Sequence, residues 1–443
     1  MPRHRVAAIV LMSALASSAV AHAADCHEIS FDEWHGTALE GPWVAHSGGH
    51  GIVVWRDPAG PKVTATEGTA RQTHALPNLL PRALAAGRDG HVLIFVDTAL
   101  QVAALPLELD GRTRGAPVSL GTAGSIYAQP TIIAEGDGYV VAWSRGDVSD
   151  NRQAIVVARL DGRGALVAGP EVIATVPRHE PPRVALATGA GVTWLAWHEL
   201  VQPEIEHAIP EVSERVHAVR LAPGRAATDD TPFLVGPGGL AGLASRNGTF
   251  VALLDGGTVG QLVFAPLDGQ PTEGRRHVIP GGNAFGALAP DADGFVLLSI
   301  SHGSGSYPRG GGATLLRLTA DGMPRGPATR VDGVNDASMS ADGQALAMVR
   351  DLPAQTTGVS RLEIDPLDGS PSTVVVETKL KLEPVTRCEE TSETGCTVAP
   401  GTRPGSGSAL LILALCALAA AITCRWTPRA QRGEKPRSCD HHR

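Results

Sequence analysis

The stretch Thr131-Ile132-Ile133-Ala134, followed across a Glu-Gly-Asp turn by Gly138-Tyr139-Val140-Val141-Ala142-Trp143, decides the fold of this chain. A short apolar segment, a turn that contains glycine and a second apolar segment are typical of a β-hairpin. The phrase occurs seven times, and its second segments begin at Gly51, Gly90, Gly138, Gly191, Gly248, Gly294 and Gly343. A hairpin repeated at this period predicts a radial array of sheets.

Most repeats continue into a second hairpin, and in the clearest copies the alternating apolar positions end at an Asp-Gly pair. The aspartates of these pairs are Asp110, Asp161, Asp268, Asp321 and Asp368. Such pairs tolerate the positive φ that tight turns need. One more short strand follows each turn, for example Glu171-Val172-Ile173-Ala174. The sequence therefore predicts an all-β fold, a β-propeller of about seven four-stranded blades. An array of β-sandwiches is the main rival, although it would need longer strands and domain linkers.

The first repeat lacks a clear second hairpin. We expect residues 374–382 near the C-terminus to complete it, so that the two ends of the chain share one blade. Tryptophans recur at or near the ends of the second strands, at Trp55, Trp143, Trp194 and Trp197. We interpret them as packing between neighbouring blades.

The N-terminus is typical of a secretory signal peptide. Arg3 and Arg5 precede an apolar run over residues 6–20, and Ala21-His22-Ala23 has the small residues of a cleavage site. Cleavage near Ala23 or Ala24 would keep Cys26 close to the new terminus.

The C-terminus predicts a membrane anchor. Residues 408–424 are almost wholly apolar and just long enough to span a bilayer, and a basic tail follows them. The positive-inside rule places that tail in the cytoplasm. A buried core helix is the alternative. The predicted organisation is a signal peptide at 1–24, a β-propeller-like repeat domain at 25–385, a linker with a Gly-Cys motif at 386–407, a transmembrane helix at 408–424 and a basic cytoplasmic tail at 425–443.

The segment Glu393-Thr394-Gly395-Cys396-Thr397-Val398-Ala399, with the apolar helix and the arginines after it, resembles the Myxo-CTERM sorting tail of myxobacterial surface proteins. The resemblance covers about the last fifty residues and implies processing and lipid attachment at Cys396. It implies a location at the cell surface or outer membrane. Without processing, the helix would hold the propeller outside the cytoplasmic membrane.

Two cysteine pairings are open. Shared closure of the ring would bring Cys26 near Cys388, and an exported protein could oxidise this pair. Cys388 could instead pair with Cys396, which lipidation of Cys396 would forbid.

Charge limits the partners. The formal net charge is −8, and the signal and the tail are both basic, so the part between them is more acidic still. An acidic surface repels phosphate backbones, so we expect no nucleic-acid partner.

Known catalytic and metal motifs are missing from the sequence. It contains no Walker loop, no HExxH, no Gly-x-Ser-x-Gly and no Rossmann fingerprint. Asp291-Ala292-Asp293-Gly294 comes closest to a calcium loop, but the apolar residues after it offer no further ligand. His35, His46 and His50 cluster without the spacing of a zinc site. We therefore expect no metal and no cofactor.

Polar residues at the ends of second strands are the candidate binding face, because such loops line the mouth of a propeller. They are Arg145, Asp147, His198, Glu199, His302 and Arg350. Solvated loop residues are the simpler interpretation of each one taken singly.

We expect a non-catalytic binding or scaffold module for protein or glycan partners. The alternative is a propeller hydrolase or lyase that acts on extracellular polysaccharide. Two carboxylates, or a histidine and a carboxylate, converging in an axial pocket would favour the enzyme, whereas a mouth lined by aliphatic or unpaired residues would favour binding.

Overall fold

The computed structural model describes residues 25–29, 40–67, 70–125, 128–147, 152–177, 182–201, 213–255, 259–266, 276–280, 285–301, 311–352, 359–367, 373–379 and 385–389. The chain divides into two compact units. One is residues 30–384, and the other combines residues 1–29 with 385–443.

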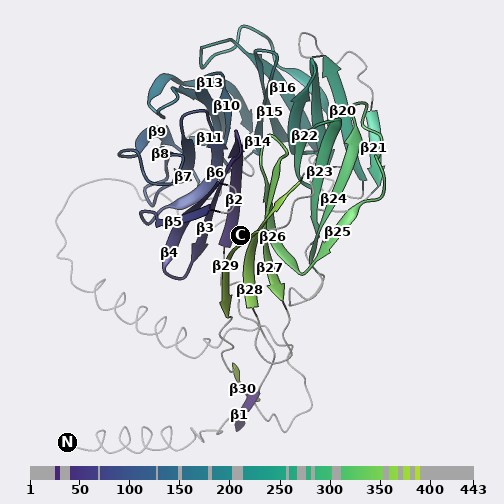
Figure 1. Ribbon diagram of the computed structural model, residues 1–443. Helices are drawn as coiled ribbons and strands as arrows, with labels where there is room; N and C mark the ends of the chain where they lie inside the picture. Colours follow the sequence, from purple (N-terminus) through teal and green to yellow (C-terminus); the bar gives the residue numbers. More distant parts are fainter. Residues whose placement is uncertain are drawn as a thin grey trace, which may run out of the picture. The chain divides into compact units, whose positions relative to one another are not determined.

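The larger unit consists of seven antiparallel four-stranded sheets, or blades, each made of four consecutive strands (Figure 1). Blade 1 contains β2 (Glu40–Ser47), β3 (His50–Asp57), β4 (Gly60–Glu67) and β5 (Ala70–Ala75). Blade 2 contains β6 (Leu80–Ala86), β7 (His91–Val96), β8 (Gln101–Leu107) and β9 (Val118–Thr122). Blade 3 contains β10 (Thr131–Glu135), β11 (Gly138–Asp147), β12 (Arg152–Leu160) and β13 (Leu166–Pro177).

The remaining blades repeat this order. Blade 4 contains β14 (Val184–Gly189), β15 (Val192–Val201), β16 (Ser213–Leu221) and β17 (Phe233–Pro237). Blade 5 contains β18 (Gly239–Arg246), β19 (Thr249–Asp255), β20 (Val259–Pro266) and β21 (Arg276–Pro280). Blade 6 contains β22 (Phe285–Asp291), β23 (Gly294–Ser301), β24 (Gly312–Thr319) and β25 (Thr329–Asp332). Blade 7 contains β26 (Val334–Met339), β27 (Ala345–Leu352), β28 (Val359–Pro366) and β29 (Thr373–Lys379).

The first strands of the blades form a closed inner ring. Each contacts the first strand of the next blade, and β26 of blade 7 returns to β2 of blade 1. A separate hydrophobic cluster fills every seam between neighbouring blades, from the cluster of blades 1 and 2 to that of blades 7 and 1. The predicted all-β propeller of seven four-stranded blades is confirmed, and the closed ring rules out the array of sandwiches.

The ring closes without a shared strand, so the prediction that residues 374–382 complete the first repeat is wrong. Blade 1 supplies its own outer strands β4 and β5, while β29 pairs with β28 in blade 7. The sequence hides β5 because it is an edge strand whose side chains lie largely in solvent, so it needs no alternation of apolar residues. Packing of Val44 and Trp55 against Ala347 and Leu362 joins the two blades instead.

The recurrent glycines have a steric cause. A Cβ atom on Gly138 would collide with the carbonyl oxygen of Leu160, and one on Gly294 would collide with that of Leu318. Both carbonyls belong to the end of the third strand, which comes too close for any side chain. At Gly248 the reason is different, because its φ of +75° favours glycine.

The tryptophans pack between blades, as predicted. Trp143 is fully buried in the cluster between blades 2 and 3, and its indole Nε1–H donates to the carbonyl of Thr122 at 3.1 Å. Trp194 lies in the cluster between blades 4 and 5, with its ring centroid 5.1 Å from that of Phe250. Neither is placed to stack on a ligand.

The smaller unit contains one antiparallel strand pair, β1 (Asp25–Ile29) with β30 (Val385–Glu389), in which Cys26 stands opposite Cys388. The predicted signal peptide, the Gly-Cys motif with Cys396, the transmembrane helix and the basic tail fall outside the described residues. Within the ranges that the structure describes, no helix has the length and apolar character needed to cross a bilayer.

Candidate binding pocket at the mouth of the ring

The ring has two faces, which are defined by the direction of the strands. The first strand of each blade begins on one face, which we call the mouth face, and the antiparallel second strand ends there. The turns between first and second strands lie on the opposite side, which we call the hairpin face. A pocket of about 230 Å³ opens among the blades at the mouth face.

The pocket lies where the first strands of blades 4, 5 and 6 begin. Its lining comes from one residue before β10, one residue before β14, and the starts of β14, β18 and β22: Gln129, Arg183, Val184, Ala185, Leu240, Ala241 and Gly286. Arg183 and Gln129 are exposed, whereas Val184 and Leu240 are buried. The inner edge of the ring therefore carries a small hollow with an aliphatic floor and polar walls.

This lining can bind but offers little chemistry. One guanidinium and one amide can donate hydrogen bonds to hydroxyl or carboxylate oxygens of a ligand. No carboxylate or histidine is among the described residues that line the pocket. Among these described lining residues there is thus neither a carboxylate pair nor a histidine–carboxylate pair of the kind that general acid–base catalysis uses.

His198 holds the backbone of Arg183, one of the residues that line the pocket. Its Nδ1 accepts a hydrogen bond from the backbone N–H of Arg183 at 2.9 Å. Its own backbone N–H donates to the carbonyl of Arg183 at 3.2 Å. Because Nδ1 is the acceptor, a neutral His198 carries its proton on Nε2. The predicted residue His198 is thus brought to the pocket, where it positions the start of β14.

Glu199 is directed elsewhere, because successive side chains of a strand point to opposite faces of the sheet. Its Oε1 lies 3.1 Å from Nε2 of His217 on β16. The His217 ring in turn stacks on Trp197, with ring centroids 5.9 Å apart. Glu199 therefore belongs to a structural cluster within blade 4, and the sequence neighbours His198 and Glu199 do not act together.

Arg350 is likewise engaged by the protein itself, within blade 7 and with the carbonyl of Asp332 at the end of blade 6. Its Nη1 donates to Oε2 of Glu363 at 3.0 Å, and Glu363 is buried. Arg361 bonds to both Glu363 and Glu377 and extends this chain of ion pairs along blade 7. A buried carboxylate needs such a partner, so Arg350 serves the packing of blade 7.

Two other predicted site residues, Arg145 and Asp147, are not among the residues that line the pocket. Arg145 is half-buried near the mouth end of β11, opposite Ala154. Asp147 ends the same strand, opposite Arg152. His302 lies outside the residues that the structure describes. Sequence reasoning missed Arg183 and Gln129, which precede first strands. The antiparallel order of the strands could have indicated them, because a residue that precedes a first strand lies on the same face as a residue that ends a second strand.

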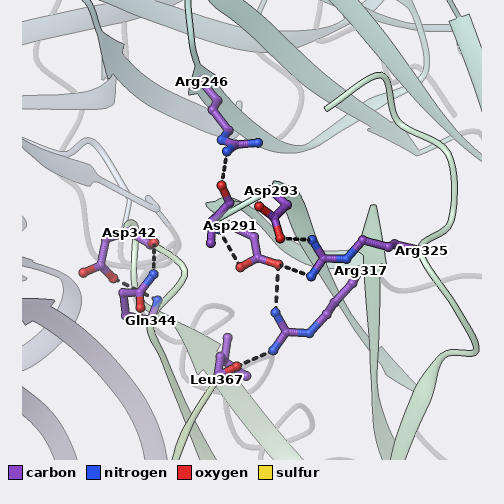
Figure 2. A network of polar contacts seen from close by, with 9 residues as sticks. Arg246, Asp291, Asp293, Arg317, Arg325, Asp342, Gln344 and Leu367 are labelled. Carbon is purple, nitrogen blue, oxygen red and sulfur yellow. Dashed lines mark hydrogen bonds and ion pairs between the residues drawn. The ribbon is translucent and has the colours of Figure 1, made fainter. Parts of the chain in front are cut away.

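The calcium-like stretch of blade 6 lies on the hairpin face and is an ion-pair network (Figure 2). Oδ2 of Asp291 lies 2.8 Å from Nη1 of Arg317 and 3.4 Å from Nη2 of Arg325. Asp293 pairs with the other nitrogen of Arg325 at 2.9 Å. Arg246 of blade 5 donates to the carbonyl of Ala292. The two carboxylates thus bind arginines, and across the described part of the chain no group of three or more potential ligands could hold a metal ion.

The network also fixes the charge of Asp291. Burial alone would raise the pKa of its carboxyl group. The backbone N–H of Ala292 and the guanidinium groups of Arg317 and Arg325 outweigh burial, so the net effect lowers the pKa below its ordinary value. Asp291 is therefore ionised at neutral pH and pairs with arginines of its own blade, one of which, Arg317, also donates to the carbonyl of Leu367 in blade 7.

No family model matches the chain, and no curated protein matches its sequence. Solved structures resemble it at low identity. The Dos1 propeller is 10% identical with a TM-score of 0.40, over 73% of this chain and 78% of that chain. Prolyl oligopeptidase B from Galerina marginata is 8% identical with a TM-score of 0.47, over 78% of this chain and 52% of that chain. This chain therefore spans about half the length of that protein.

A third solved structure is the PQQ-bound aldose sugar dehydrogenase from Streptomyces coelicolor. It is 15% identical with a TM-score of 0.37, over 62% of this chain and 92% of that chain. These likenesses concern the fold alone.

Proposed function

We propose that this chain is an exported β-propeller, held at the cell surface or at a membrane, that binds protein or glycan partners without transforming them. The observation that carries the binding role is the lining of the mouth pocket, where Arg183 and Gln129 stand over aliphatic residues. The export and anchoring rest on the sequence of the two chain ends and on the resemblance to the Myxo-CTERM tail.

A glycan fits this lining well. Sugar hydroxyls accept hydrogen bonds from a guanidinium or an amide, and a uronate carboxylate can accept two parallel bonds from one arginine. The aliphatic floor formed by Val184 and Leu240 can receive the apolar face of a sugar ring. The pocket volume of about 230 Å³ holds one or two sugar residues at most, so a chain end or a branch is the expected ligand.

The test is an array of neutral and acidic oligosaccharides probed with the full-length protein released from cell envelopes. Ala241→Trp would fill the pocket, and Arg183→Ala would remove its charge. Arg163→Ala is the matched control, because Arg163 is an exposed arginine beside a turn on the hairpin face. We expect the two pocket variants to lose binding by about tenfold or more, since one charge-assisted pair is worth about 1.5–3 kcal/mol. Equal binding by all four proteins would overturn the pocket as the site.

The alternative function, a polysaccharide hydrolase or lyase, is tested by its reaction products. Polysaccharide incubated with the protein would gain reducing ends under a hydrolase, and unsaturated sugars under a lyase. We expect neither product. Product formation that survives Ala241→Trp would place a catalytic centre elsewhere on the ring, and product formation lost in that variant would make the pocket catalytic.

Anchoring is tested by the intact mass of the protein from its native envelope. A chain that ends at or near Cys396 with lipid mass would support sorting to the surface. A chain that runs from about Asp25 to Arg443 would contradict lipid attachment and support a single-pass membrane protein.

A further inference from the structure

Two cysteines from opposite ends of the chain meet in one strand pair. In the register of β1 and β30, Asp25 stands opposite Glu389, Cys26 opposite Cys388, and Ile29 opposite Val385. Residues directly opposite each other in an antiparallel pair have Cα atoms about 4.5 or 5.5 Å apart. Disulfides join residues whose Cα atoms are about 4.4–6.8 Å apart, so the backbone already sets the separation that a bridge needs.

Such a bridge would connect two blades that no shared strand connects. Strand β1 precedes blade 1 in the chain, and β30 follows blade 7. Those two blades share no strand, because each of the seven sheets is built from consecutive strands. Side-chain packing and a few hydrogen bonds, such as Val44 N–H to Ser338 Oγ at 3.2 Å, are what hold this seam. A covalent link between residues 26 and 388 would enclose the whole ring in one loop.

We propose that Cys26 and Cys388 form a disulfide that fastens the first blade to the last. The two thiols lose their protons, and one sulfur–sulfur bond forms between them. The two electrons reduce the disulfide of a thiol–disulfide oxidoreductase in the export compartment, which leaves as a dithiol. The proposal rests on the export that is part of the proposed function, but it does not depend on which partner the propeller binds.

The bond is tested on the full-length protein purified from cell envelopes with thiols blocked at lysis. A Glu-specific protease separates Cys388 from Cys396, because Glu389, Glu390 and Glu393 lie between them. We expect a non-reduced digest to contain the peptides of Cys26 and Cys388 joined, and a reduced digest to contain them apart. Blocked free thiols at both positions, or a link between Cys388 and Cys396, would overturn the proposal.

Two variants test whether the disulfide stabilises the seam between blades 7 and 1. Cys388→Ser should leave Cys26 as a free thiol, whereas Cys396→Ser, the matched control, should leave the bridge intact. We expect amide hydrogens of β2 and β26, at the seam, to exchange about tenfold faster in Cys388→Ser, while those of β14 across the ring keep their rates. Unchanged exchange at the seam would show that the bridge, even if present, does not fasten the ring.

Discussion

Arg183 and His198 are joined by two hydrogen bonds, from the backbone N–H of Arg183 to Nδ1 of His198 and from the backbone N–H of His198 to the carbonyl of Arg183. The first of these bonds uses a side chain at the end of β15 to hold the residue before β14. Arg183 is one of the residues that line the mouth pocket, so the imidazole of His198 holds the backbone from which the charged side chain of Arg183 extends.

Replacement of His198 should therefore weaken ligand binding through Arg183. His198→Asn keeps an acceptor near the position of Nδ1, whereas His198→Phe keeps the bulk and removes the acceptor. We expect the Phe variant to be less stable than the Asn variant by about 1 kcal/mol, the usual net value of one hydrogen bond. Urea unfolding measures this difference, and the oligosaccharide array should rank the variants in the same order. Identical behaviour of the two variants would contradict a positioning role.

Burial of His91 should make the ring sensitive to acid. Its side chain is almost fully buried, and burial is the main cause that lowers its pKa to about 4, with the charges of His50 and Arg114 adding to the effect. The unfolded chain takes up the proton at a higher pH than the folded one. The stability from this residue is thus complete above pH 6.5 and is lost as the pH falls towards 4.

The size of the His91 effect follows from the shift. One pKa unit corresponds to about 1.4 kcal/mol, so about 3 kcal/mol should disappear across this window. We expect His91→Leu to remove that dependence, which is measured as the difference in unfolding free energy between variant and native chain at successive pH values. The difference should be constant above pH 7. A difference that stays constant down to pH 4 would show that His91 does not titrate as described.

Arg159 should matter far more than an exposed arginine. It is buried on β12, forms an ion pair with Glu135, and donates from Nη2 to the carbonyl of Ala222 in blade 4 at 3.0 Å. Arg159→Ala would remove the charged partner of Glu135 and the side-chain donor to the carbonyl of Arg225, at a cost of about 3 kcal/mol or more. The exposed Arg112, paired with Asp110, is the control, and its alanine variant should unfold like the native chain. Denaturant unfolding of both variants checks the comparison, and similar losses would contradict it.

Calcium should leave the protein unchanged. A calcium site needs about six to eight oxygen ligands, and the carboxylates of Asp291 and Asp293 are already paired with arginines. We expect the same melting temperature in millimolar calcium and in excess chelator. A rise in calcium that Asp293→Asn abolishes would show that the ion displaces Arg325.

The repeat pattern predicted the blades because local chemistry controls them. Glycine is required where the third strand approaches Gly138 and Gly294, and Asp-Gly pairs mark the outer turns, so the hairpins are visible in the sequence. The prediction that C-terminal residues complete the first blade was wrong because its edge strand leaves no clear pattern in the sequence. The edge strand β5 packs on one neighbour and faces solvent, so nothing in its sequence distinguishes it from a loop.

The site was predicted only in part because a mouth pocket is assembled from distant segments. His198 could be selected by its place at the end of a second strand, but the same rule selected Glu199 and Arg350, which are held by His217 and Glu363. Arg183 precedes a first strand, and no composition signal marks it. Which polar residue faces the pocket depends on strand register and side-chain alternation, which become known only with the structure.

The absence of a shared strand between blades 7 and 1 has a consequence for synthesis of the chain. Each blade is complete when its fourth strand leaves the ribosome, so no early segment must wait unpaired for a late one. Folding can proceed blade by blade, and docking of blade 7 on blade 1 is a late step. A circularly permuted chain that starts at any blade boundary would keep all seven sheets intact, so this ring has no obligatory beginning.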